Sequence, residues 1–87
     1  MREQVENFLR ERFPGMEVDL GPVEHGSPRI SGVLIWNGFA NMDVAEQQAC
    51  VWDALRERFG VETVNISTLL TFTPDEAEAL RPESWPA

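Results

Sequence analysis

Between residues 2 and 13, apolar residues recur every three or four positions and charged residues lie between them. These apolar residues are Val5, Phe8, Leu9 and Phe13. Such spacing places them on one face of a helix, and the Pro14-Gly15 pair that follows does not continue a helix. The pattern therefore predicts an amphipathic helix that ends at this pair.

The next two patterns are typical of β-strands. Residues 16–20 alternate strictly between apolar and acidic side chains, which indicates a strand with one buried face. Residues 30–36 are rich in β-branched and aromatic side chains, so we expect a central strand that is partly covered on both faces. The intervening residues 21–29 hold two glycines and two prolines and predict a loop, which contains His25.

Residues 43–59 have the clearest helical pattern of the chain. Asp43 is followed three residues later by Glu46, the arrangement of a capping box, and Gly60 is a natural helix end. The expected buried face comprises Val44, Gln48, Val51, Trp52, Leu55 and Phe59. A glutamine on such a face is unusual, which makes Gln48 a candidate binding residue as well as a candidate packing residue.

Residues 61–72 alternate in the manner of a third strand. We expect one side to carry Val64, Ile66, Thr68, Leu70 and Phe72, and the other to carry Asn65, Ser67, Leu69 and Thr71. Thr73 as cap, Pro74 in the first helical position and Glu76 then predict the start of a last helix. Residues 81–87 are expected to be a frayed tail.

The elements follow one another in the order αββαβα, which predicts an α+β fold. We expect residues 1–80 to form a single domain with a three-stranded mixed sheet and helices packed on one face. A helical crossover between the second and third strands would make that pair parallel. At 87 residues, the chain is long enough for one modest core and too short for two.

The net charge of the chain limits the classes of molecule that it is expected to bind. Fifteen acidic residues oppose seven basic ones, all arginine, and give a net charge of -8. Nucleic-acid binding draws much of its affinity from clustered Lys and Arg, so we expect no nucleic-acid partner. The paired arginines of the helices alternate with glutamate and are expected to be solvated. These are Arg10, Arg12, Arg56 and Arg58.

Membrane and catalytic functions are also disfavoured. No apolar run approaches the roughly 18 residues that cross a bilayer, and no signal core precedes the first helix, so we expect a cytoplasmic protein. One histidine and one cysteine do not suffice for a zinc site without carboxylates, and His25 has no neighbours that would orient it in a catalytic triad. We therefore expect no enzymatic activity.

Three stretches resemble the BolA family, whose fold is the class II KH-like arrangement. VLIWNGF (33–39) is similar to the family's second strand and its turn phenylalanine, here Phe39. VWDAL (51–55) is similar to the hydrophobic end of the family's helix, and TLLTFTPDE (68–76) to its closing strand and helix start. The resemblance covers roughly residues 2–80 and supports the same fold class.

The resemblance implies a non-enzymatic adaptor that binds a monothiol glutaredoxin and acts in iron-sulfur trafficking or the stress response. Family members share a 2Fe-2S cluster with this partner through a histidine at the start of the third strand, where this chain has Asn65. An amide is a poor cluster ligand. The second family ligand lies in the loop that holds His25, the one possible cluster ligand here. Gln47, Gln48 and Ala49 stand where the family has Arg-His-Arg.

The candidate partner-binding residues combine this resemblance with the apolar turn after residue 35. An exposed Trp36 beside Phe39 and Met42 would form a partner-binding patch, whereas buried rings would be packing. The full set is His25, Trp36, Phe39, Met42, Gln48 and Asn65. A KH-like nucleic-acid regulator and a divergent domain with an unknown ligand remain the alternatives, although no two glycines have the spacing of a Gly-x-x-Gly loop.

Overall fold

The computed structural model describes residues 1–21 and 29–80 and confirms the predicted α+β order. The helices are α1 (Arg2–Arg12), α2 (Val44–Phe59) and α3 (Pro74–Leu80), and the strands are β1 (Glu17–Leu20), β2 (Ile30–Ile35) and β3 (Ile66–Phe72). Two short 3-10 helices, η1 (Asn37–Phe39) and η2 (Gly60–Asn65), precede α2 and β3. The predicted loop around His25 and the predicted frayed tail lie outside the described residues.

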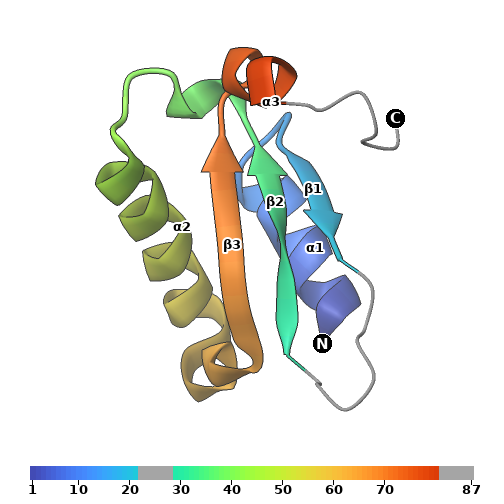
Figure 1. The fold of residues 1–87 in the computed structure, drawn as a ribbon. Helices are drawn as coiled ribbons and strands as arrows, with labels where there is room; N and C mark the ends of the chain where they lie inside the picture. Colours follow the sequence, from blue (N-terminus) through green and yellow to red (C-terminus); the bar gives the residue numbers. More distant parts are fainter. Residues whose placement is uncertain (22–28, 81–87) are drawn as a thin grey trace.

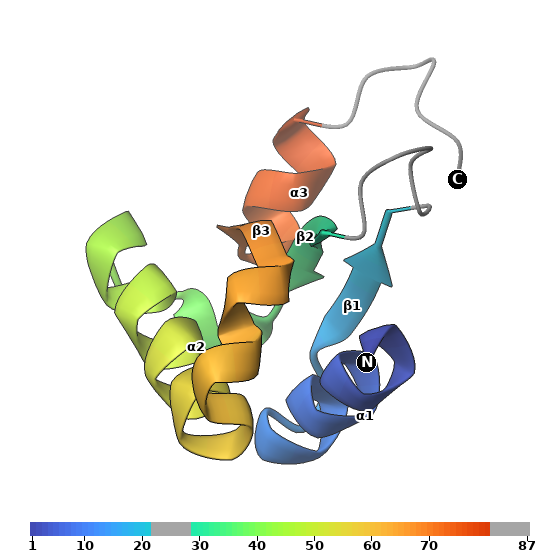
Figure 2. The same cartoon turned by 90° about the horizontal axis from the view of Figure 1, so that it is seen from below.

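The sheet has the order β1-β2-β3 (Figure 1). β1 pairs with β2 antiparallel, and β2 pairs with β3 in parallel through the α2 crossover, as predicted. α1 and α2 cover one face of the sheet, whereas the shorter α3 lies against one end of the opposite face (Figure 2). The prediction that helices pack on one face is therefore right for the two long helices.

The core fills the space between the sheet and the two long helices. Its buried apolar side chains include Val5, Leu9, Phe13, Val18, Leu20, Ile30, Leu34, Phe39, Val51, Leu55, Ile66 and Leu69. Phe8 and Phe59 close the gap between α1 and α2 in an edge-to-face contact, with ring centroids 5.6 Å apart. One layer of apolar side chains thus joins all three strands to both helices.

α2 begins as predicted but turns a different face to the sheet. Asp43 accepts a hydrogen bond from the backbone of Glu46, and the Glu46 carboxylate accepts one from the backbone of Asp43. The buried face consists of Gln47, Val51, Ala54 and Leu55, whereas Val44 is 65% exposed. Placing Val44 on the buried face was wrong, because a polar side chain, Gln47, occupies the buried position in the first turns.

β3 also differs from its predicted pattern. Residues 60–65 form η2, so the strand begins only at Ile66. Ile30 pairs with Ile66 but Ser31 pairs with Thr68, which leaves Ser67 as an extra residue in the strand. Such a bulge reverses the faces of the residues beyond it. Leu69 and Thr71 therefore point into the core, and the prediction that Thr68 and Leu70 share the face of Ile66 was wrong.

Candidate functional site

Gln47 is the most buried polar residue among those described, with 3% of its surface exposed. Its Nε2 donates to the backbone oxygens of Phe39, at 3.3 Å, and Met42, at 3.1 Å. Its Oε1 accepts a 2.9 Å hydrogen bond from the hydroxyl of Thr71. The side chain thereby fastens the turn before α2 to the end of β3, and its polar atoms are occupied within the fold.

Gln48 extends the same network along the edge of the sheet. Its Nε2 donates to the backbone oxygen of Leu69 at 2.8 Å and to Oγ1 of Thr71 at 3.3 Å. Its Oε1 accepts a 3.0 Å hydrogen bond from the indole of Trp52. We call Gln47, Gln48 and Thr71 the amide lock. In the described part of the chain, every buried side-chain nitrogen and oxygen has a hydrogen-bond partner.

The amide lock accounts for the two glutamines as packing residues. Sequence reasoning singled out Gln48 and missed Gln47 and Thr71 as a buried polar pair. The sequence pattern placed Thr71 on the same side of its strand as Asn65 and Ser67, and it left Gln47 out of the expected buried helix face. Neither pattern indicated that the two side chains meet in the core. Because the amides are neutral and their polar atoms are engaged, this part of α2 offers neither the charge nor the imidazole that the family places there.

The turn after β2 buries most of the expected aromatic patch. The Trp36 indole donates a 2.9 Å hydrogen bond to the backbone oxygen of Pro14 and contacts the rings of Phe13 and Phe39 edge to face. Phe39 has no exposed surface, which is the packing alternative that the sequence left open, so its side chain is not available to a partner. Met42 is partly buried against the core. The turn after β2 lies against the end of α1, where the Trp36 ring contacts Phe13 and Pro14 and is thereby fixed in place.

The remaining candidates lie at the other end of the sheet. Asn65 is exposed immediately before β3, and its Nδ2 lies 3.6 Å from Sδ of Met1. The segment that contains His25 leaves and re-enters the sheet at this end, since the backbone of Gly21 bonds to Ser31 and Arg29 contacts the backbone oxygen of Val64. His25 itself lies outside the described residues.

The six candidate residues are therefore not gathered at one site. Trp36, Phe39, Met42 and Gln48 surround the end of the sheet from which α2 starts, because Trp36 bonds to Phe72 at the end of β3. Asn65 lies at the start of β3, at the opposite end (Figure 1). Of the five candidates that the structure describes, Asn65 alone is exposed, whereas Trp36, Met42 and Gln48 are partly buried and Phe39 is fully buried.

The described residues do not fit a metal or cluster site. Within residues 1–21 and 29–80, no three His, Cys, Asp or Glu side chains are grouped to hold a metal ion. Asn65 offers an amide that donates toward a thioether, and Cys50 is a single, partly buried thiol on α2. Position 65 thus presents an amide, which is a weaker metal donor than an imidazole or a thiolate.

The arginines of the long helices are engaged locally. Arg10 forms a 2.7 Å ion pair with Glu6, and Arg56 lies 3.5 Å from Asp53. Arg12 and Arg58 lie over the rings of the neighbouring phenylalanines. Over residues 1–21 and 29–80, no helix combines the length and apolar character that crossing a bilayer requires.

Comparison with known proteins adds support at the level of the fold. No protein-family model and no curated protein matches the chain. Solved structures do match, and three of them are BolA or Bol-like proteins. BolA1 from Arabidopsis thaliana is 16% identical, with a TM-score of 0.68 over 86% of this chain and 93% of that one. A BolA homologue from Coxiella burnetii is 18% identical, with a TM-score of 0.69 over 90% and 96%.

A Bol-like protein from Babesia bovis is 20% identical, with a TM-score of 0.67 over 91% of both chains. All three proteins match nearly along their full length, which agrees with the resemblance of the three sequence stretches. This chain therefore has a BolA-like fold.

Proposed function

We propose that this protein is a small non-enzymatic adaptor that binds a monothiol glutaredoxin through the Asn65 end of the sheet, without ligating a 2Fe-2S cluster at that residue. The observation that carries the proposal is the exposure of Asn65 beside both ends of the segment that holds His25. Asn65 and the described flanks of that segment, Gly21 and Arg29, thus lie at the same end of the sheet.

The side chains at the Asn65 end of the sheet suit a protein contact that involves no cluster ligation. An amide lacks the donor strength of imidazole or thiolate, so Asn65 is suited to hydrogen bonding across an interface. Around it, Val61 and Val64 of η2 are 86% and 68% exposed, which adds apolar surface for a partner. Any role in iron-sulfur trafficking or the stress response would pass through this protein contact.

The non-enzymatic part of the proposal rests on the distribution of reactive groups. Cys50, the only thiol, lies on α2 with the acidic Glu46 and Asp53 one turn to either side of it. The only histidine of the sequence, His25, belongs to a different segment of the chain. Nucleophile and base are thus not paired in sequence or along one element.

A titration monitored by NMR tests the interaction. Isotope-labelled protein is mixed with a monothiol glutaredoxin, with and without its cluster, and we expect backbone shifts at Met1, Val64 and Asn65 in both mixtures. An Asn65→Asp variant should weaken binding by placing another negative charge in this surface, while Asn7→Asp on the exposed side of α1 serves as the charge-matched control. Absence of shifts in both mixtures would rule out the proposed partner.

A further inference from the structure

The outer face of the sheet, opposite α1 and α2, carries two rows of side chains that are exposed or partly exposed. Strand pairing places Asp19, Val33 and Leu70 in one row across the three strands. A second row consists of Glu17, Ile35 and Phe72. Each row begins with a carboxylate on β1 and continues with two apolar side chains. The bulge in β3 creates this order, because it turns Leu70 outward, where 49% of its surface is exposed.

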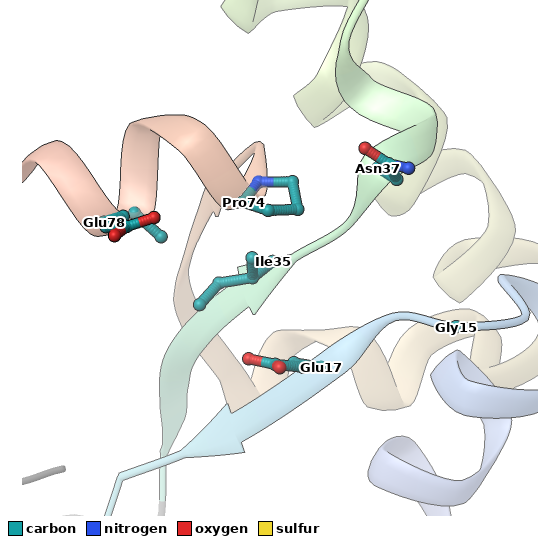
Figure 3. A pocket seen from close by; sticks show the side chains of 7 residues that line it. Gly15, Glu17, Ile35, Asn37, Pro74 and Glu78 are labelled. Atoms are coloured by element: carbon teal, nitrogen blue, oxygen red, sulfur yellow. The ribbon is translucent and has the colours of Figure 1, made fainter.

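Two hollows lie along these rows. A hollow of about 470 Å³ lies between α3 and β1, and Figure 3 shows Glu17 and Glu78 on either side of Ile35 there. A shallower hollow of about 430 Å³ lies over Val33 and Leu70, toward the start of β3. We call the face that carries both hollows the groove. Val33 and Ile35 of β2 lie along its middle, Asp19 and Glu17 pair with them from β1, and Glu78 of α3 lines the first hollow.

Among residues 1–21 and 29–80, no ion pair includes Glu17, Asp19 or Glu78, the carboxylates of this groove. In the described part of the chain, the ion pairs lie on α1 and α2, away from this face. The whole sequence contains no lysine, and Arg29 contacts the backbone of Val64 at the end of the sheet. The groove therefore combines exposed apolar surface with carboxylates that form no ion pair within the described part of the chain.

We infer that this groove docks a basic, apolar segment of a protein partner. Lysine and arginine side chains lay their aliphatic stems along apolar surface while their charged ends reach outward. Stems over Val33 and Leu70 would place cations beside Asp19, and stems over Ile35 would place them beside Glu17 and Glu78. This inference uses a different surface from the proposed glutaredoxin contact and stands independently of it.

Charge also decides against two other occupants. A second copy of the chain, with a net charge of -8, would bring the same carboxylates against one another. The chain's own residues 81–87 contain one arginine and one glutamate, so their side-chain charges cancel and do not complement the groove. A cationic segment from another protein is the occupant whose charge matches.

The test uses two synthetic peptides and the full chain with labelled backbone and methyl groups. One peptide alternates arginine with valine over six residues, and the other alternates glutamate with valine. We expect the arginine peptide to shift the methyl signals of Val33, Ile35 and Leu70 at about 0.1 M salt, where long-range attraction is screened beyond about 10 Å. The glutamate peptide should shift none of them.

Matched variants separate docking from general attraction to an acidic protein. Leu70→Gln keeps the net charge and should weaken binding roughly fivefold, because it removes half-exposed apolar surface from the groove. Val44→Gln changes a valine on α2 that is 65% exposed, more than Leu70, and should have no effect. The double variant Glu17→Gln with Asp19→Asn should weaken binding more than Asp53→Asn with Glu57→Gln on α2, although both remove two charges.

Two results would overturn the inference. The attraction would be non-specific if both double charge variants weakened binding of the arginine peptide equally and Leu70→Gln bound it as tightly as the unmodified protein. A shift of the Trp85 indole signal in Leu70→Gln without peptide, absent in Val44→Gln, would make the chain's own C-terminal segment the occupant. Loss of glutaredoxin binding would affect neither measurement, because that contact is assigned to the Asn65 end.

Discussion

The hydroxyl of Thr71 on β3 donates a buried 2.9 Å hydrogen bond to Oε1 of Gln47 on α2. The amide nitrogen of Gln47 holds the backbone of Phe39 and Met42 in turn. One side chain thus couples the crossover helix α2, the edge strand β3 and the turn that precedes α2. Buried polar groups are costly when they lose a partner, so this pair makes a sharp test of the fold.

Removing either member of the pair should destabilise the protein strongly. Gln47→Ala and Thr71→Val should each lower the free energy of unfolding by about 2 kcal/mol, since each leaves buried polar atoms unpaired. The double variant should lose about 1 kcal/mol less than the sum of the single losses, because the two residues bond directly. Urea unfolding followed by far-UV circular dichroism measures this, with Gln4→Ala on exposed α1 as the control.

Additive losses, or no loss at Gln47, would contradict the buried hydrogen bond. No loss of stability in Gln47→Ala would mean that the Gln47 side chain is exposed to solvent.

Gly38 should not tolerate a side chain. A Cβ atom at this position would overlap the ring of Trp36, which is fixed by its bond to Pro14 and by the neighbouring phenylalanines. Gly38→Ala should therefore lower the free energy of unfolding by about 1–3 kcal/mol and change the tryptophan fluorescence. Gly21→Ala is the matched control, since a Cβ atom there meets only ordinary contacts. Equal stability of the two variants would mean that the indole does not cover Gly38.

Phe39 should behave as a core residue. Its side chain has no exposed surface, so Phe39→Ala should lower the free energy of unfolding by about 3–5 kcal/mol, much of the stability of a small domain. Val61→Ala, at a residue that is 86% exposed, should change it by less than about 0.5 kcal/mol. Thermal unfolding of both variants distinguishes core packing from the partner-binding role expected from the sequence. A stable Phe39→Ala protein would favour the latter.

The capping box of α2 should contribute a measurable amount. Asp43→Ala removes the side-chain acceptor 2.8 Å from the backbone nitrogen of Glu46 and should lower the free energy of unfolding by about 1 kcal/mol. Asp53→Ala, in the exposed middle of the same helix, carries the same charge change without a cap. If both variants unfolded at the same denaturant concentration, the cap would not stabilise the helix.

Element order and strand direction could be predicted from the sequence because they depend on long patterns. The helical spacing in α1 and the alternation in β1 extend over whole elements, and the crossover helix determines the parallel pairing. The facing of β3 could not be predicted in this way, because one extra residue, Ser67, reverses the alternation after it. A bulge of this kind leaves no mark on composition.

The candidate site was predicted less well, for a related reason. A polar side chain within an amphipathic pattern is expected to be exposed, whereas Gln47 is buried because Thr71 and two carbonyl groups satisfy it. Such partners come from distant parts of the chain and are visible only in three dimensions. Phe39 was misplaced similarly, since the packing of a turn over α1 has no periodic signal.

The central claim is partner binding without cluster ligation at position 65, and the visible circular dichroism of the glutaredoxin cluster tests it most directly. We predict that the unmodified protein binds and leaves the cluster signal unchanged, whereas Asn65→His changes the signal by supplying an imidazole ligand. Adding His25→Ala to Asn65→His should reverse that change if the second family position completes the ligand set. A changed cluster signal with the unmodified protein would contradict the claim.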